Sequence, residues 1–179
     1  GIFHHAGASI SQELGLALAT GAEYLVSLAD TGLNTKQIAQ RMSFHFLTGS
    51  EYFPEIAKLR SVRSLWSVIT NAFIPGNKDF SRMSINCSTS GYVQTLFDSY
   101  NNLLRGTTAA MSAILGGADS LTVLPFDSAT GNCGEFSERL SRNIQLILRE
   151  EAYFNKVADP SAGSYYIENL TDKISENAW

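Results

Sequence analysis

The sequence has 179 residues, of which 44% are hydrophobic and 17% are charged. This length predicts one domain with enough chain to bury a sizeable core, and the composition excludes a disordered chain and a disulfide scaffold. Thirteen Lys and Arg residues against seventeen Asp and Glu residues give a net charge of −4, and no basic run is present. We therefore expect neither a nucleic-acid partner nor an anionic membrane as a partner.

The cysteines and the chain start give two further expectations. Cys87 and Cys133 form no C-x-x-C motif, which favours reduced thiols in a cytoplasmic protein. No apolar run approaches the roughly 18 residues of a transmembrane helix, and no signal peptide is visible. The chain opens on Gly1 rather than a methionine, and strand-like residues follow at once. We therefore expect a piece of a longer protein.

Strand and helix patterns alternate along the chain. Ser9 is the expected N-cap of the first long helix, because Gln12 follows three residues later. In chain order we predict a strand at 2–3, a helix from Ser9 to about Asp30, a short helix beginning at 35, a strand at 42–47, a helix at 52–73 ended by the turn 75–77, a strand at 82–87, a helix at 97–115, a strand at 121–125, a helix at 135–154 and a helix over the last dozen residues.

The spacing of these elements predicts an α/β fold. Strand centres recur about every 40 residues, which favours parallel strands joined by crossover helices. About four βα units form either a doubly wound sheet or half of an eight-stranded barrel, and the early chain start favours a partial (β/α)8 barrel over residues 1–179. A half barrel leaves strand edges unpaired, so we expect it to need its other half or a partner.

No motif for metal binding or nucleophilic catalysis is present. On a strand, His4 and His5 point to opposite faces, and His45 alternates with phenylalanines. The sequence contains no H-x-x-x-H, H-E-x-x-H, C-x-x-C, G-x-S-x-G, P-loop or G-x-G-x-x-G pattern. We therefore expect no metal ligand and no recognisable nucleophile.

Barrel active sites form where strands end. Asn86, Ser88, Leu124 and Ser128 lie at or beyond such ends and offer amide, hydroxyl and aliphatic groups. Proton transfer requires a histidine or carboxylate, so this rim predicts no catalytic residue. Arg41 precedes a strand and is either a surface charge or an anchor for a phosphate or carboxylate.

Charged residues at helical spacing predict ion pairs. Glu55 with Lys58, and Glu135 with Arg139, are expected on solvated helix faces. For Arg142 two alternatives stay open: its side chain joins a buried network between helices, or it is exposed to solvent.

A series of short motifs follows in a fixed order. They are Ala6-Gly7-Ala8, Glu55-Ile56-Ala57-Lys58 with Arg60 and Arg63, Thr89-Ser90-Gly91, Tyr100-Asn101-Asn102 with Arg105, Ser141-Arg142-Asn143, and Val157-Ala158-Asp159-Pro160 with Gly163-Ser164-Tyr165-Tyr166. With these motifs the sequence resembles the methylmalonyl-CoA mutase family over nearly all of its length. The resemblance implies the second half of that family's substrate-binding (β/α)8 barrel.

The family's catalytic subunit can be compared with this chain position by position. Ile2 stands where the G-Y-H-x-Q-E-A-G motif has its catalytic histidine, and His4 stands at the glutamine. The R-L-S-F-F motif, whose arginine contacts coenzyme A, retains Arg41 and Ser43. The resemblance thus implies that these two residues are what remains of a substrate site.

Two further family motifs are degenerate. In the stretch that matches R-x-H-x-Q-T-S-G, Asn86 and Ser88 replace the histidine and the glutamine. In the stretch that matches Q-S-L-H-T-N-x-x-D-E, Asp119, Leu124 and Ser128 replace the glutamine, asparagine and glutamate. The family's asparagine and glutamate hold the adenosyl group, and an aliphatic side chain cannot replace an amide's hydrogen bonds.

Loss of these groups with retention of the packing motifs resembles the family's small, or beta, subunit. The resemblance implies a non-catalytic partner that stabilises the large catalytic subunit in a heterodimer, which interconverts methylmalonyl-CoA and succinyl-CoA. Adenosylcobalamin is then expected on the large subunit and not on this chain, and a cobalamin-binding-type domain is not expected within these residues. Two alternatives stay open: a catalytically competent acyl-CoA mutase barrel, and a barrel that binds a CoA-type ligand through Arg41 without catalysis.

Overall fold

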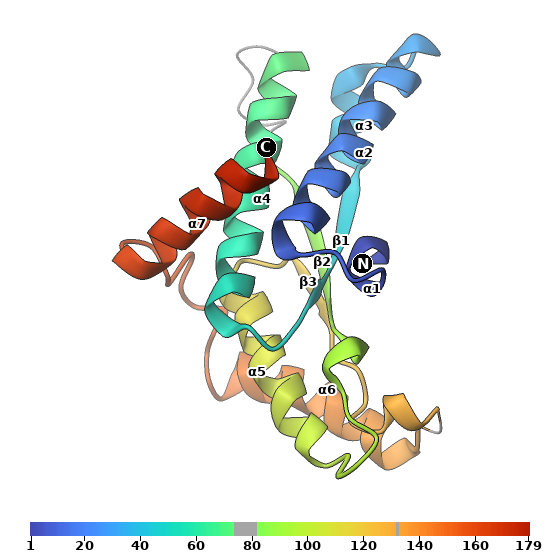
Figure 1. Ribbon diagram of the computed structural model, residues 1–179, viewed down its shortest axis with the longest axis vertical. Coiled ribbons are helices and arrows are strands. Elements are labelled where there is room, and N and C mark those ends of the chain that lie inside the picture. Colours follow the sequence, from blue (N-terminus) through green and yellow to red (C-terminus); the bar gives the residue numbers. More distant parts are fainter. Residues whose placement is uncertain (74–81, 132) are drawn as a thin grey trace.

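The computed structural model describes residues 1–73, 82–131 and 133–179, and these form helices around a parallel sheet (Figure 1). The sheet has the order β1 (Ser43–Thr48), β2 (Ser84–Thr89), β3 (Ser120–Thr122). The α-helices are α1 (Ile2–His5), α2 (Ile10–Asp30), α3 (Thr35–Arg41), α4 (Tyr52–Phe73), α5 (Asn101–Leu115), α6 (Glu135–Glu150) and α7 (Tyr165–Ala178). The predicted α/β class with parallel strands is confirmed, whereas the predicted turn at 75–77 lies outside the described residues.

Helix α2 begins where the sequence predicts. The Gln12 N–H donates to Ser9 Oγ over 3.3 Å, and the Ser9 N–H donates to Gln12 Oε1 over 3.0 Å. This capping box satisfies two backbone donors that a helix start leaves unpaired. The helix ends before Gly32, whose φ of +87° suits a residue without a Cβ.

The predicted first strand at 2–3 is wrong. Ile2 belongs to the one-turn helix α1, and its side chain is 84% exposed. Two apolar residues are too short a pattern to distinguish a strand from a helical turn, and here contacts of His4 with other elements fix the segment. His4 and His5 therefore do not alternate across a strand. Within the described residues the sheet has three strands, each with a helix after it.

Helices α2, α4 and α5 cover one face of the sheet. Phe44 of β1 meets Trp66 of α4 with ring centroids 4.8 Å apart, and both pack on α2. A Cβ on Gly21 of α2 would lie only 2.8 Å from the Phe44 ring, so this glycine permits the close approach. The main core comprises Leu14, Leu18, Leu25, Ile38, Ala39, Phe44, Phe46, Leu59, Val62, Leu65, Trp66, Met83, Ile85, Cys87 and Ala113.

Helix α5 begins at Asn101 rather than at the predicted 97. Its larger side chains Met111 and Ile114 lie partly buried against Ile144 and Leu148 of α6. The fully buried residues of α5 are small or polar, and among them are Gly106, Ala109, Ala110 and Ala113.

The C-terminal helix α7 packs across α4 and α2 (Figure 1). The Ser61 hydroxyl donates to the Thr171 carbonyl over 2.8 Å, and Arg60 lies 3.2 Å from Asp159 Oδ2 and 2.8 Å from Glu168 Oε1. These contacts hold α7 and the loop before it against α4.

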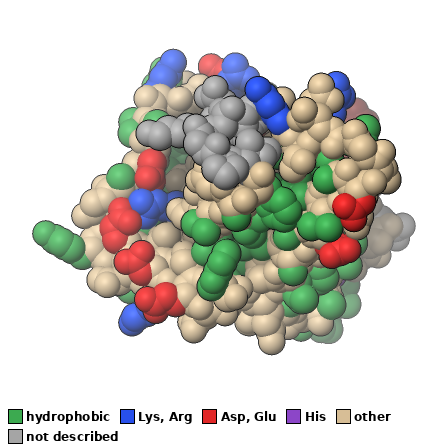
Figure 2. Space-filling model, turned by 90° about the horizontal axis from the view of Figure 1, so that it is seen from above, with side chains coloured by type: hydrophobic (Ala, Val, Ile, Leu, Met, Phe, Trp, Pro, Cys, Tyr) green, Lys and Arg blue, Asp and Glu red, His purple; other side chains and the backbone are tan. Residues whose placement is uncertain are grey.

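The sheet is open at β1 and β3, which have a strand neighbour on one side only among the described residues. Figure 2 looks onto the top of the view in Figure 1 and shows hydrophobic side chains gathered in the middle of that face. Exposed hydrophobic residues of α2 and α4 include Leu28, Val68 and Phe73. Open edges and apolar surface are compatible with a fragment of a barrel. Of the helices described, none has the length and hydropathy needed to cross a membrane.

Candidate functional site

The sheet face opposite the core is polar, and we call it the inner face. Its residues alternate with the buried ones along each strand. His45 Nε2 lies 2.9 Å from Ser88 Oγ, and the Ser120 hydroxyl donates to Asn86 Oδ1. Burial lowers the pKa of His45, so its imidazole is neutral at pH 7. The inner face comprises Ser43, His45, Ser84, Asn86, Ser88, Ser120 and Thr122.

The rim at the C-terminal ends of the strands is linked by its own hydrogen bonds. The Leu124 N–H donates to Thr89 Oγ1 over 2.9 Å. The Ser128 hydroxyl donates to Gln94 Oε1 over 2.6 Å, and Gln94 Nε2 donates to the Pro125 carbonyl over 3.1 Å. The side chains of Thr89, Gln94 and Ser128 thus bond within the protein rather than project toward a ligand.

Asn102 connects the same two loops from within. It is 1% exposed, and its Nδ2 donates to the carbonyls of Thr95 and Phe126 over 2.8 and 2.9 Å. Its Oδ1 accepts from the Thr95 N–H and from Arg105 Nη1, both over 3.0 Å. Asn102 belongs to one of the family motifs found in the sequence, and in the structure its side chain holds these two loops together.

The residues predicted as the remainder of a substrate site do not meet at one place. Arg41 ends α3 at the far end of β1 from the rim and is exposed, and its guanidinium bonds to no other residue that the structure describes. It borders a cavity of about 340 Å³ together with Leu33. Ser43 and Ile2 border a different cavity of about 520 Å³ between α1, α2 and β1.

Asp119 directly precedes β3 and so lies at the N-terminal end of the strands, opposite the rim. Its Oδ2 accepts from the Ile85 N–H over 2.8 Å and from Arg63 Nη2 over 2.9 Å. Arg63 also donates to the carbonyls of Met83, over 2.7 Å, and of Gly117. Asp119 therefore joins the beginnings of β2 and β3, away from Leu124 and Ser128.

The charged residues of α6 are exposed. Arg139 lies over the Phe136 ring, 5.6 Å from its centroid, and Glu135 is exposed as predicted. Arg142 pairs with Glu138 at 3.8 Å on the surface, so the exposed alternative holds for this residue.

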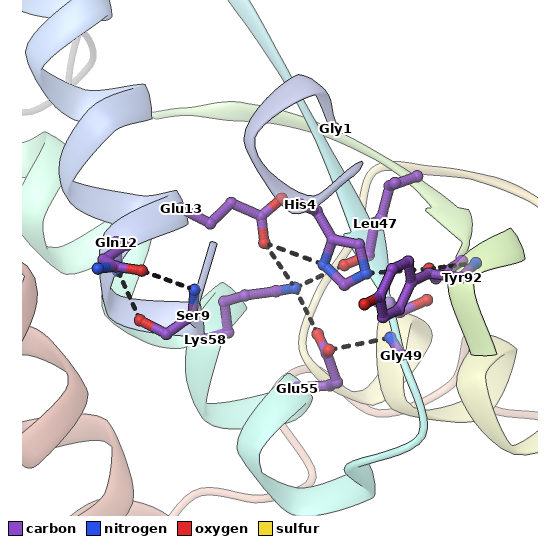
Figure 3. Close-up of polar contacts among 12 residues, drawn as sticks. Gly1, His4, Ser9, Gln12, Glu13, Leu47, Gly49, Glu55, Lys58 and Tyr92 are labelled. Atoms are coloured by element: carbon purple, nitrogen blue, oxygen red, sulfur yellow. Dashed lines mark hydrogen bonds and ion pairs between the residues drawn. The ribbon is translucent and has the colours of Figure 1, made fainter. Parts of the chain in front are cut away.

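The predicted solvated pair of Glu55 and Lys58 is wrong, because both side chains are buried (Figure 3). Lys58 Nζ lies 2.5 Å from Glu55 Oε2 and 3.2 Å from Glu13 Oε2, and it donates to the Leu47 carbonyl over 2.5 Å. The Gly49 N–H donates to Glu55 Oε1 over 2.9 Å. We call Glu13, Glu55 and Lys58 the ionic cluster; it joins α2 and α4 to the end of β1.

Two members of the ionic cluster have shifted pKa values. Burial acts to raise the pKa of Glu13, but the hydrogen bond with His4 and the charge of Lys58 lower it below its usual value. Burial acts to lower the pKa of Lys58, but Glu55 and Glu13 raise it. Both groups are therefore charged at neutral pH.

The helical pattern contains a signal for this burial. Residues 55, 58, 62 and 65 are three, four and three positions apart, and Val62 and Leu65 belong to the core. Glu55 and Lys58 thus lie on the buried stripe of α4. Within the described residues, no group of three or more His, Cys, Asp or Glu side chains is arranged to hold a metal ion.

Comparisons with known proteins match the chain along its whole length. Residues 2–179 match the model of a family described as methylmalonyl-CoA mutase. The chain is 51% identical over 175 residues to the methylmalonyl-CoA mutase small subunit of Porphyromonas gingivalis, covering 97% of this chain and 28% of that protein.

Two subunits from Propionibacterium freudenreichii subsp. shermanii are also similar. The methylmalonyl-CoA mutase small subunit is 39% identical over 180 residues, covering 99% of this chain and 28% of that protein. The large subunit is 38% identical over 174 residues, covering 97% of this chain and 24% of that protein. The chain spans about a quarter of the length of these relatives.

Proposed function

Because the chain belongs to the methylmalonyl-CoA mutase family, we propose that it is part of the small subunit of an adenosylcobalamin-dependent enzyme that interconverts methylmalonyl-CoA and succinyl-CoA. In this proposal it is the second half of a (β/α)8 barrel whose remainder comes from the same polypeptide. The identity of 51% to a small subunit over nearly the whole chain supports the assignment.

We propose that this chain supplies no catalytic group. The observation that carries the proposal is the rim, where Ser128 and Gln94 bond each other and Leu124 is aliphatic. The position that matches the family's catalytic histidine is Ile2, which cannot exchange a proton. Among rim and inner-face residues, His45 is bonded to Ser88, and Asn86 to Ser120.

The residues present do not fit an adenosyl group. A ribose offers hydroxyls that need donors and acceptors, and the Leu124 side chain has neither. The Ser128 hydroxyl and the Gln94 amide are occupied by one another and by the Pro125 carbonyl. We therefore place adenosylcobalamin on the large subunit and derive no step of the reaction from this chain.

The proposed role is to stabilise the large subunit in a cytoplasmic heterodimer. A partner that binds only the folded state stabilises that state by mass action. The open sheet edges and the exposed hydrophobic residues of α2 and α4 support contacts with further protein, either the rest of the barrel or the partner.

The test compares the complete polypeptide that contains this chain, alone and mixed with the large subunit, in a methylmalonyl-CoA turnover assay with adenosylcobalamin. We expect no turnover and no cobalamin binding by the small subunit alone. In the mixture we expect a stable complex whose activity is higher or survives longer than that of the large subunit alone.

A matched variant sharpens this test. Ser128→Ala in the small subunit should leave the turnover of the complex within about twofold of the parent, because its hydroxyl serves only a loop contact. Turnover by the small subunit alone, or a collapse of turnover in Ser128→Ala with the complex intact, would overturn the non-catalytic role.

One observation favours a second candidate, a barrel that binds a CoA-type ligand. Arg41 is exposed at the end of α3, just before β1 begins, and is available for an anion. Calorimetry with coenzyme A on the complete small subunit, and on Arg41→Ala, tests it. Binding that Arg41→Ala weakens at least tenfold supports ligand binding, and absence of binding dismisses it.

A further inference from the structure

A groove between α5 and α6 is apolar and opens to solvent. The two helices lie against each other at the lower end of the view in Figure 1. The groove has a volume of about 220 Å³, and it is lined by Leu103 of α5 and by Leu140 and Ile147 of α6. Leu104, the next residue along α5, is also exposed.

Aromatic rings continue this groove toward the rim. Tyr100, at the start of α5, stacks on Phe126 with ring centroids 5.0 Å apart. Phe126 meets Phe136 of α6 in an edge-on arrangement, with ring centroids 6.4 Å apart. The groove and these rings form one surface, which we call the α5–α6 face; it comprises Tyr100, Leu104, Phe136, Leu140 and Ile147.

The apolar stripe of α6 is only partly covered. Apolar residues at 136, 140, 144 and 147 are four, four and three positions apart, which is the pattern of one helix face. Ile144 is buried, whereas Phe136 and Ile147 are exposed. Since helices bury such stripes against other elements, α6 lacks a neighbour over part of its stripe among the described residues.

Completion of the barrel does not cover the α5–α6 face. The sheet is open at β1 and β3, so further strands join it at those two edges. Their helices then lie beside α2 and beside α6 in the outer ring. Helix α5 already has α4 and α6 as neighbours. The groove between α5 and α6 therefore stays on the outer surface of the complete barrel.

The exposed area of this face suits a protein interface. Four of its side chains are between 48% and 66% exposed, and they are Tyr100, Leu104, Phe136 and Ile147. Together they present about 500 Å² of surface. Because an interface is about 60% apolar, an apolar area of this size corresponds to about 800 Å² on each partner, which is the standard size of a stable interface.

We propose that the α5–α6 face is the docking surface for the large subunit, which seats an apolar helix in the groove. This inference rests on the proposed heterodimer. A groove between two helices accepts the side-chain ridge of a third, and the stripe from 136 to 147 extends over about three helical turns. Arg139, which lies over the Phe136 ring, is exposed at one end of the face, so a carboxylate on the partner helix is complementary to it.

The test measures the affinity of the complete small subunit for the large subunit by calorimetry. The double variant Leu104→Glu, Ile147→Glu places two charges at the groove, and we expect its dissociation constant to rise by about a hundredfold. Both positions are exposed, so the melting temperature of the small subunit alone should stay within about 3 °C of the parent. Tyr165→Glu, at an exposed position of α7, is the matched control and should bind as the parent does.

Hydroxyl-radical footprinting of the parent proteins gives a second readout that needs no variant. Tyr100 and Phe136 should be oxidised in the small subunit alone and about fivefold less in the complex, because the core of an interface excludes water. Tyr165 should be oxidised equally in both. Unchanged affinity of the double variant, or equal oxidation of Tyr100 and Phe136 in the complex, would place the interface elsewhere and overturn the proposal.

Two other occupants of the face have distinct outcomes, and each overturns the proposal. Protection of Tyr100 and Phe136 in the isolated small subunit at every concentration means that its own polypeptide covers the face. Protection that disappears on dilution means that a second copy covers it. If the parent small subunit does not bind the large subunit, the proposed heterodimer is wrong and this inference fails with it.

Discussion

Replacement of Lys58 by methionine tests the buried ionic cluster. Lys58 is fully buried, with Glu55 at 2.5 Å and Glu13 at 3.2 Å. Methionine fills similar space but leaves two buried carboxylates facing each other without a cation. Removal of one partner from a buried ion pair costs about 3–5 kcal/mol, so we expect a loss of that size in the free energy of unfolding.

Amide hydrogen exchange of the Leu59–Trp66 backbone is the appropriate assay, because a multidomain protein need not unfold in two states. The expected loss corresponds to exchange faster by about two to four orders of magnitude. Lys173→Met on the exposed side of α7 is the matched control, and we expect less than about 0.5 kcal/mol there. The triple variant Glu13→Gln, Glu55→Gln, Lys58→Met should recover much of the loss. If Lys58→Met exchanges no faster than Lys173→Met, the assigned burial and pairing are wrong.

Three further predictions follow from single contacts. Gly21→Ala should lower stability by about 1–3 kcal/mol despite the better helix propensity of alanine, because its Cβ would press on the rings of Phe44 and Trp66; a higher melting temperature would contradict this. Asp119→Ala should cost about 1–3 kcal/mol in urea unfolding, since it leaves the Ile85 N–H unpaired and removes the carboxylate partner of Arg63. Arg82→Gln should change little, because the Arg82 side chain is 83% exposed and lies 3.8 Å from Asp119. Burial raises the pKa of Cys87 to about 12, so iodoacetamide at pH 8 should label Cys133 and spare Cys87, and equal labelling by peptide mass spectrometry would refute the assigned burial.

Long periodic patterns predict most of the helices and strands correctly. The Ser9 capping box sets the start of α2, and the apolar spacing of 52–73 matches α4 to its ends. The segment at 2–3 fails because two residues carry no periodicity, and its conformation depends on Ser90 and Glu13, which are distant in the sequence.

The candidate site is less predictable than the fold. Glu55 and Lys58 have the spacing of any surface pair, and their burial depends on Glu13, which α2 brings in from 45 residues away along the chain. Asp119 belongs to the same sequence motif as Leu124, yet β3 lies between them. A residue before a strand and a residue after it lie at opposite ends of that strand. The bond between Ser128 and Gln94 depends on how two loops meet, which no local pattern encodes.

The position of α7 has a consequence for biosynthesis. This helix covers α4 and α2, and the bond between Ser61 of α4 and Thr171 of α7 spans 110 residues of sequence. Contacts between distant segments slow folding, because the intervening chain must be ordered before they form. As the polypeptide leaves the ribosome, α4 therefore presents an uncovered flank until α7 has emerged. Translation up to residue 164 leaves an intermediate that a chaperone able to shield this flank would recognise.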